Sequence, residues 1–347
     1  MSLLEPIKSR TGPSSHIDRG EVTYLEALRA ALEDELIERP NLFLIGEDIG
    51  TYGGAFKLTD GFSDRFGEHR VIDTPIAEGG IIGTAIGASL MGMLPVVEMQ
   101  FMDFISCGFN QLTNFAAKCH YRWGASVPIV VRGPGGGLVG GGPFHSQSVE
   151  VYFTKTAGLK VVMPSDVHDA YALMRAAIAD PNPVVFIEHK ALYRAPQLRK
   201  RLPTGDELKR LSRLGESIMR RAGDDLVIIT YGAMVHRALE AAQRLAHEEI
   251  SASVLDLRTL SPLDEDGIAQ SVRETGRALI LHEDTRSSGL AGELSAIINE
   301  RAFEWLDAPI KRLTAPDTPV PYHAQLEHAF APQVDDIVDA VKQLAAY

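Results

Sequence analysis

Residues 71–100 predict a strand–helix–strand unit, and this unit constrains the fold more than any other part of the chain. A strand begins at Val71 and ends before Pro75, because proline cannot donate to a strand ladder and disfavours helix in the residue before it. Glu78 then stands directly before an uncharged segment, residues 79–93, that is rich in glycine and alanine. So much glycine lowers helix propensity, and close approach of another backbone or of a cofactor would compensate for that loss.

Glu78 on its own has two interpretations. An acid in the first turn of a helix is favoured by the helix dipole and needs no other role. Alternatively, the turn delivers a functional carboxylate to the edge of a sheet. The residues at the neighbouring strand ends, described below, favour the functional interpretation.

Helix-like and strand-like segments alternate along the chain, which predicts an α/β fold with doubly wound, mostly parallel sheets. The alternation divides the chain into a first domain, residues 21–190, and a second domain, residues 223–347. Residues 191–222 lack the pattern, carry many Arg, Lys and Pro residues, and are interpreted as a linker. Residues 1–20 mix both signs of charge without an apolar centre, which predicts a polar N-terminal arm.

The expected elements follow from apolar periodicity and from capping residues. In the first domain we expect helices at residues 23–39, 104–121 and 165–179, and strands at 42–45, 71–72, 127–132, 159–163 and 183–187. In the second domain we expect helices at residues 235–247, 264–275, 289–303 and 334–345, and strands at 226–230, 253–257, 278–282 and 310–314.

Composition and charge exclude several classes of protein. With 45% hydrophobic and 23% charged residues, the 347-residue chain suits a globular protein of two domains. A net charge of −12 does not suit the binding of nucleic-acid phosphates. The longest uncharged run, residues 81–97, contains Pro95 and is shorter than the roughly 20 residues of a membrane span.

The cysteines and the first twenty residues bear on location. Cys107 and Cys119 are spaced wrongly for a metal site and indicate a reducing compartment. Residues 1–20 resemble neither a secretion signal nor a transit peptide. We therefore expect a cytoplasmic protein that binds neither nucleic acid nor membrane.

Ligands of open parallel sheets bind beyond the carboxyl ends of the strands. At the expected strand ends the chain carries two acids, an amide, an aromatic ring and an imidazole: Glu47, Glu78, Gln100, Phe104 and His145. The glycine-rich loop before His145, residues 133–143, lacks the lysine of a P-loop and the spacing of a dinucleotide motif. A site for a nucleoside triphosphate is therefore not expected.

A set of ordered motifs resembles one protein family. The motifs are residues 73–80, 98–104, 132–136, 145–147, 183–185 and 258–264. They resemble the β subunit of the thiamine-diphosphate-dependent 2-oxoacid dehydrogenases, the first components of the pyruvate and branched-chain complexes. The resemblance runs from about residue 23 to the C-terminus. It implies a transketolase-like pyrimidine-binding domain, then a transketolase C-terminal domain, in an α2β2 heterotetramer.

The resemblance implies roles for three residues. Glu78 matches the glutamate that hydrogen-bonds the aminopyrimidine of the cofactor. The aminopyrimidine then removes the proton from C2 of the cofactor's thiazolium ring. Phe104 matches an aromatic that packs on the pyrimidine; its alternative is an ordinary core residue. His145 matches a histidine suited to proton transfer or to guiding the lipoyl group, and its alternative is a structural histidine.

Two further positions resemble cofactor contacts. Glu47 resembles a member of the acidic path between the two cofactors of the tetramer, and its alternative is a solvated acid at a strand end. Gln100 occupies a position that faces the pyrimidine or the substrate.

The resemblance also implies a potassium site at Ile129, Ala177, Ile178, Asp180 and Asn182, which would offer carbonyl groups and one acid. Residues 177–183 independently indicate a helix end followed by a turn, where unpaired carbonyls collect. A purely structural helix end is therefore the alternative.

Single-chain thiamine enzymes hold the diphosphate through magnesium with a Gly-Asp-Gly motif. The sequence has no such motif, only Gly205-Asp206-Glu207 and Gly223-Asp224-Asp225. Because an unneutralised diphosphate binds poorly, we expect an α subunit to supply the magnesium site and to share the thiamine diphosphate.

The family's β subunits also dock the subunit-binding domain of a dihydrolipoyl acyltransferase and meet its lipoyl domain. Acids of the second domain that look exposed in sequence would serve such docking: Glu283, Asp284, Asp335, Asp336 and Asp339. The alternative is that these acids only keep the surface soluble. Two alternatives to this function stay open, the β subunit of an acetoin-cleaving complex and a transketolase-like scaffold without catalysis. The joint presence of Glu78, Phe104 and His145 argues against the scaffold.

Overall fold

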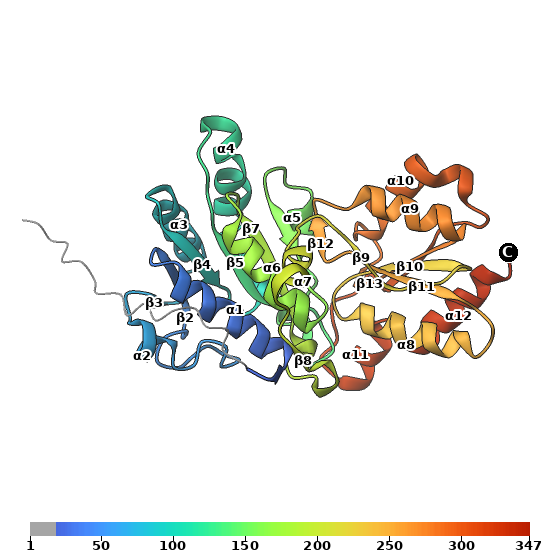
Figure 1. Cartoon of the computed structure of the whole chain (residues 1–347), viewed down its shortest axis with the longest axis horizontal. Helices are drawn as coiled ribbons and strands as arrows, with labels where there is room; N and C mark the ends of the chain where they lie inside the picture. The colour runs from blue at the N-terminus through green and yellow to red at the C-terminus, as the bar shows by residue number, and fades with distance from the viewer. Residues whose placement is uncertain (1–18) are drawn as a thin grey trace, which may run out of the picture.

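The structure, a computed structural model, describes residues 19–347. The predicted polar arm therefore lies almost entirely outside the described residues. Figure 1 shows two α/β units side by side along the long axis of the molecule, each built around its own sheet.

The first sheet has seven strands in the order β12-β6-β7-β5-β4-β2-β3. Six of them run parallel and belong to the first domain: β2 (Leu42–Glu47), β3 (Val71–Thr74), β4 (Leu94–Glu98), β5 (Val130–Gly135), β6 (Lys160–Val162) and β7 (Val184–His189). The seventh, β12 (Thr259–Ser261), comes from the second half of the chain and pairs antiparallel with β6. The predicted parallel α/β sheet is confirmed, while this edge strand was not expected.

Helices α1 (Tyr24–Glu38), α2 (Phe62–Phe66), α3 (Glu78–Leu90), α4 (Ala117–Trp123), α5 (Val151–Thr154) and α6 (Val167–Ala179) connect and cover the strands. Thr23 and Glu26 form a capping box at the start of α1. The side chain of Asp166 caps α6 by accepting a hydrogen bond from the Asp169 amide at 2.9 Å. Both helices begin where capping residues predicted.

The single helix expected at residues 104–121 is wrong. The chain there forms a 3₁₀ segment η1 (Met102–Gly108), a π-helical segment η2 (Gln111–Ala116) and only then α4. Packing against α3 explains the irregularity, because a Cβ at Gly108 would lie 2.3 Å from Cδ1 of Ile82. Tertiary contact therefore overrides local helix preference.

The second sheet has five strands in the order β14-β13-β10-β11-β9. The strands are β9 (Ile218–Arg221), β10 (Leu226–Thr230), β11 (Ala252–Asp256), β13 (Ala278–Thr285) and β14 (Lys311–Ala315). All pairs are parallel except that of β9 with β11. The accompanying helices are α8 (Met234–Ala246), α9 (Glu265–Thr275), α10 (Ala291–Ala302), α11 (Ala324–Phe330) and α12 (Val334–Ala345).

The segment interpreted as a linker contains regular structure. Besides short turns η4 (Lys190–Leu192) and η5 (Pro196–Leu198), it holds β8 (Lys200–Arg201), α7 (Gly205–Leu211) and β9. Strand β8 pairs with β1 (Glu21–Val22), and β9 enters the second sheet. A buried ion network then joins the domains: Arg258 pairs with Asp169 at 3.0 Å, and Arg220 pairs with Asp169 and, at 3.5 Å, with Asp166.

Buried aliphatic and aromatic side chains fill both faces of each sheet. Within residues 19–347, no helix has the length and apolar character needed to cross a bilayer.

Candidate functional site

The five residues expected at one sheet edge come from four adjacent strands of the first sheet. Glu47 ends β2, Glu78 begins α3 just after β3, and Gln100 follows β4 by two residues. Phe104 lies in η1, and His145 follows the short turn η3 (Gly142–Phe144) in the loop after β5. Because β3, β2, β4 and β5 are neighbours and parallel, these positions lie at the same carboxyl edge.

The imidazole of His145 lies within a group of aromatic rings. Its ring centroid is 4.7 Å from that of Phe101 and 5.5 Å from that of Phe104, both nearly perpendicular. Phe101 in turn contacts Phe104 at 6.2 Å and Phe56 at 5.7 Å. The structure thus brings Phe104 and His145 together. Phe101 was not singled out, although it lies inside the 98–104 motif.

The two acids of the site interact electrostatically. Burial, then the charge of Glu78, then that of Asp48 raise the pKa of Glu47 above its ordinary value. Glu78 is half-buried, and its carboxylate accepts no hydrogen bond from any residue of the described chain. Its oxygens are therefore free for a ligand, while Glu47 holds a proton more readily than a solvated acid does.

Gln100 is half-buried at the same edge. Its side-chain amide has no hydrogen-bond partner within residues 19–347. It can therefore donate to and accept from a ligand, but no contact joins it to Glu78 or His145.

A buried ion cluster fixes the strand ends beneath these residues. Arg132, in the middle of β5, pairs with Glu98 of β4 and with Glu188 of β7. The Tyr193 hydroxyl donates to Glu188 at 2.5 Å. Burial raises the pKa of Glu98 despite the nearby guanidinium. Sequence reasoning missed this cluster, although charged residues at the ends of apolar strands were a visible signal.

Two acids expected on the surface are buried. Glu283 and Asp284 are 6% and 7% exposed, at the end of β13. Glu283 contacts His189 and the glycine loop of the first domain. Their predicted use in docking is therefore wrong, and the second domain contributes more to the site edge than the sequence indicated. Asp335, Asp336 and Asp339 are exposed, as expected.

The residues expected to bind potassium lie together, and several of their polar groups already have one partner. The Asp180 carboxylate pairs with the Lys160 ammonium and accepts the Asn182 amide at 2.9 Å. The Ile129 carbonyl accepts the Val184 amide at 2.9 Å, and the Ala177 carbonyl accepts that of Asp180 at 3.3 Å. Ile178 lies at the same helix end. The potassium site therefore stays a prediction, with a structural helix end as its alternative.

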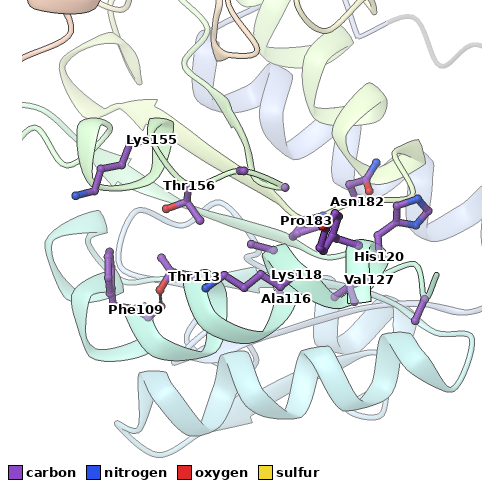
Figure 2. A pocket seen from close by; sticks show the side chains of 15 residues that line it. Phe109, Thr113, Ala116, Lys118, His120, Val127, Lys155, Thr156, Asn182 and Pro183 are labelled. Carbon is purple, nitrogen blue, oxygen red and sulfur yellow. Dashed lines mark hydrogen bonds between the residues drawn. The ribbon is translucent and has the colours of Figure 1, made fainter. Parts of the chain in front are cut away.

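A hollow of about 790 Å³ lies elsewhere, between η2–α4 and the chain segments that precede β5 and β7 (Figure 2). Phe109, Thr113, Lys118, Val127 and Pro183 are among the residues that line it. It contains none of the five residues of the strand-end site, so it is a separate surface feature.

Comparison with known proteins gives two family matches. The pyrimidine-binding domain of transketolase matches residues 20–196, and the C-terminal domain of transketolase matches residues 215–337. A solved structure described as a split-gene transketolase, an inactive β4 tetramer, superposes with a TM-score of 0.73. It is 22% identical and covers 94% of this chain and 99% of its own, which shows the fold.

Several curated proteins are similar over nearly the whole chain. The 2-oxoisovalerate dehydrogenase subunit beta of Bacillus subtilis is 45% identical over 94% of this chain and 99% of its own length. The pyruvate dehydrogenase E1 component subunit beta of the same organism is 41% identical over 94% and 99%. A mitochondrial pyruvate dehydrogenase E1 component subunit beta-2 of Oryza sativa is 42% identical over 93% and 86%.

Proposed function

The chain belongs to the family of E1 β subunits of 2-oxoacid dehydrogenase complexes, and on that premise we propose that it forms the pyrimidine-binding half of a thiamine diphosphate site shared with an α subunit. The observation that carries the proposal is Glu78: a half-buried carboxylate with free oxygens at the strand-end edge that also holds Phe104 and His145. The reaction is oxidative decarboxylation of a 2-oxoacid with transfer of the acyl group to a lipoyl group.

The donor set suits the pyrimidine half of the cofactor. Glu78 offers an acceptor for a ring N–H, Phe104 an apolar face and Gln100 an amide. When bound, thiamine diphosphate supplies the carbon nucleophile that attacks the 2-oxo group. Glu78 would hold a proton at the pyrimidine ring of the cofactor and would thereby change the basicity of the aminopyrimidine.

His145 and Glu47 act around this contact. The imidazole of His145 lies nearly perpendicular to two neighbouring phenyl rings, and these contacts limit its rotation. It donates or accepts a proton as the acyl group is transferred. Glu47, with its raised pKa, exchanges a proton with Glu78 and so belongs to an acidic path between cofactors.

Two features support a partner α subunit. The sequence lacks the Gly-Asp-Gly motif for magnesium and diphosphate, so the α subunit would hold both. Apolar side chains also project from the ends of α3 and from α4: Ile76 is 82% exposed, Met91 84% and Tyr121 96%. Exposed apolar surface of this kind marks a protein interface, and Ile76 lies two positions before Glu78, where a shared cofactor needs the partner.

The comparisons name both branched-chain and pyruvate enzymes, and the acetoin alternative is not favoured. The lipoyl and subunit-binding domains of an acyltransferase complete the proposed partners. A cytoplasmic location agrees with the two cysteines, which are both free thiols.

The proposal predicts that the isolated chain is inactive. Alone it should decarboxylate no 2-oxoacid and bind thiamine diphosphate only weakly in calorimetry, because the diphosphate half of the site is missing. Co-expression with the α subunit should restore turnover with pyruvate or a branched-chain 2-oxoacid. Turnover by the isolated chain, or an assembled α2β2 protein inactive with every 2-oxoacid, would overturn the proposal.

A further inference from the structure

The loop that carries His145 is held in place by carboxylates. Glu327 accepts hydrogen bonds from the backbone amides of Leu138 at 2.9 Å and Gly140 at 2.8 Å. Glu283 accepts the Gly137 amide at 3.2 Å. At the other end of the loop, Asp103 accepts the Gln147 amide at 3.0 Å.

Two of these acids belong to the second domain. Glu327 lies on α11 and Glu283 on β13, whereas Asp103 lies in η1 beside Phe104. Glu283 is also hydrogen-bonded to Nε2 of His189 at 2.7 Å. Burial would raise the pKa of Glu283, but the interaction with His189 and the nearby Lys190 lower it below its ordinary value. Glu283 is therefore held as a carboxylate.

Glu327 is buried, at 5% exposure, and forms no salt bridge with any residue of the described chain. A buried carboxylate is costly unless hydrogen bonds satisfy it. Its two oxygens each receive one amide of the same loop. The contact is therefore specific to the shape of the loop and not a general charge pairing.

This clamp explains the glycines of the loop. Gly136 has φ +75°, and a Cβ there would lie 2.4 Å from both Oε1 of Glu283 and Nε2 of His189. A Cβ at Gly142 would lie 2.6 Å from the Tyr322 ring. A cavity of about 10 Å³, about one water in size, lies between the loop and the second domain. The glycines allow the loop backbone to approach carboxylates closely. This role differs from that of a glycine-rich loop that binds a phosphate.

We propose that Glu327 is a positioning residue: through the Leu138 and Gly140 amides it sets the place of His145 against Phe101 and Phe104. The inference rests on the proposed function for its catalytic consequence. The second domain thereby controls a group of the first domain's site without contacting the cofactor.

The test is Glu327→Gln in the assembled α2β2 protein. Glutamine has the same shape but only one acceptor oxygen, and its amide group would face a loop N–H. Packing is thus preserved while one hydrogen bond is lost. Gln325→Ala, an exposed change on the same helix, is the matched control.

Two readouts do not depend on activity. Amide hydrogen exchange of residues 136–147 should accelerate about tenfold or more, as expected for loss of a hydrogen bond to a charged group. Acylation of His145 by diethyl pyrocarbonate should also accelerate, while the exposed His247 reacts unchanged. If Glu327→Gln does not assemble, Glu327→Asp, which keeps the charge but shortens the reach, should give the same changes.

Turnover supplies the third readout. We expect kcat to fall with little change in KM for the 2-oxoacid, because His145 is displaced and substrate binding is not. Unchanged exchange, unchanged His145 labelling, or a variant with full kcat would each overturn the inference. If the wild-type assembly turns over no 2-oxoacid, the proposed function fails, whereas the exchange and labelling results still test the clamp.

Discussion

At the residue scale, the site edge combines acids whose environments differ. Glu47 is buried and lies close enough to Glu78 for the charge of Glu78 to raise its pKa. Glu78 has unoccupied oxygens at the start of α3. On the proposed function, the pair separates two tasks: Glu78 would contact the cofactor, and Glu47 would store a proton beside it.

Replacing Glu78 by glutamine should preserve the fold and remove the acid. We expect exchange of the cofactor C2 proton in the assembled protein to slow by about 10²- to 10⁴-fold, the usual range for a general acid or base. Proton NMR of the exchange in deuterated buffer measures it. Glu68→Gln, at an exposed acid on the same domain, should exchange as fast as wild type. An unchanged rate in Glu78→Gln would mean that the role belongs to another residue.

Glu150 predicts a pH dependence of stability. It is buried where the domains meet and accepts the Tyr231 hydroxyl at 2.8 Å. Burial, then the charge of Asp284, raise its pKa from 4.5 to about 8. Between those values the folded state binds more protons than the unfolded state, so the stability that the protonated group contributes is lost as pH rises.

Glu150→Gln should remove this loss. Relative to wild type, the variant should gain up to about 1.4 kcal/mol in free energy of unfolding per pH unit between pH 5 and 8. Urea denaturation at several pH values measures the difference. The exposed Glu293→Gln is the control and should show no pH-dependent gain. Parallel stability curves for Glu150→Gln and wild type would contradict the prediction.

At the element scale, the glycine loop after β5 is shaped by what it touches. Gly136 and Gly140 both have positive φ, but a Cβ at Gly136 would collide with Glu283 and His189, whereas nothing lies within 4 Å of a Cβ at Gly140. A side chain at Gly140 would therefore cause backbone strain alone, whereas a side chain at Gly136 would cause both backbone strain and a collision.

Gly136→Ala should therefore lower the activity of the assembled protein much more than Gly140→Ala does. Both variants carry the strain of a left-handed alanine, about 1 kcal/mol, and only Gly136→Ala must also displace the buried, hydrogen-bonded side chains of Glu283 and His189. We expect kcat of the assembled protein to fall at least tenfold further in Gly136→Ala. Similar kcat values for the two variants would show that contact with the second domain does not control the loop.

Long periodic elements could be predicted from the sequence, and short or tertiary ones could not. The strand Leu226–Thr230 and the helix Val334–Ala345 were expected at the bounds found. Strand β12, helix α11 and the π-helical η2 were not, because each is short and is stabilised by packing against distant chain. The helix expected over residues 104–121 failed for the same reason.

The residues of the site also differ in whether the sequence could predict them. Glu78, Phe104 and His145 were found because strand ends and motifs mark them in sequence. Glu283 and Glu327 were missed as contacts of the loop, since they lie 146 and 187–189 positions away from their partners and resemble ordinary surface acids. Only the arrangement of the two domains brings them to the loop.

At the scale of the whole molecule, charge bears on assembly. The chain has a net charge of −12, and α12 exposes Asp335, Asp336 and Asp339. Asp335 pairs with Arg244 at 2.6 Å, and Asp336 accepts the Gln333 amide at 2.8 Å at the start of α12. The Asp339 carboxylate has no hydrogen-bond or ion-pair partner within residues 19–347. A basic subunit-binding domain of an acyltransferase would be attracted to this helix.

We therefore expect docking through the second domain that weakens with salt. Surface plasmon resonance of the assembled protein on an immobilised subunit-binding domain should show an association rate that falls as ionic strength rises. Asp339→Lys should slow association, whereas Glu68→Lys on the first domain should not. Equal association rates at low and high salt would contradict electrostatic docking by these acids.

Strand β12 has a consequence for how this protein can be divided. Residues 259–261 cover the outer edge of β6, so a gene fragment that ends before them would express the first domain with a bare strand edge. Bare edges recruit strands from other molecules. Such a fragment should aggregate or exchange strands. The pairing of β12 with β6 indicates that co-production with the remaining half would prevent this, whereas a solubility tag would not.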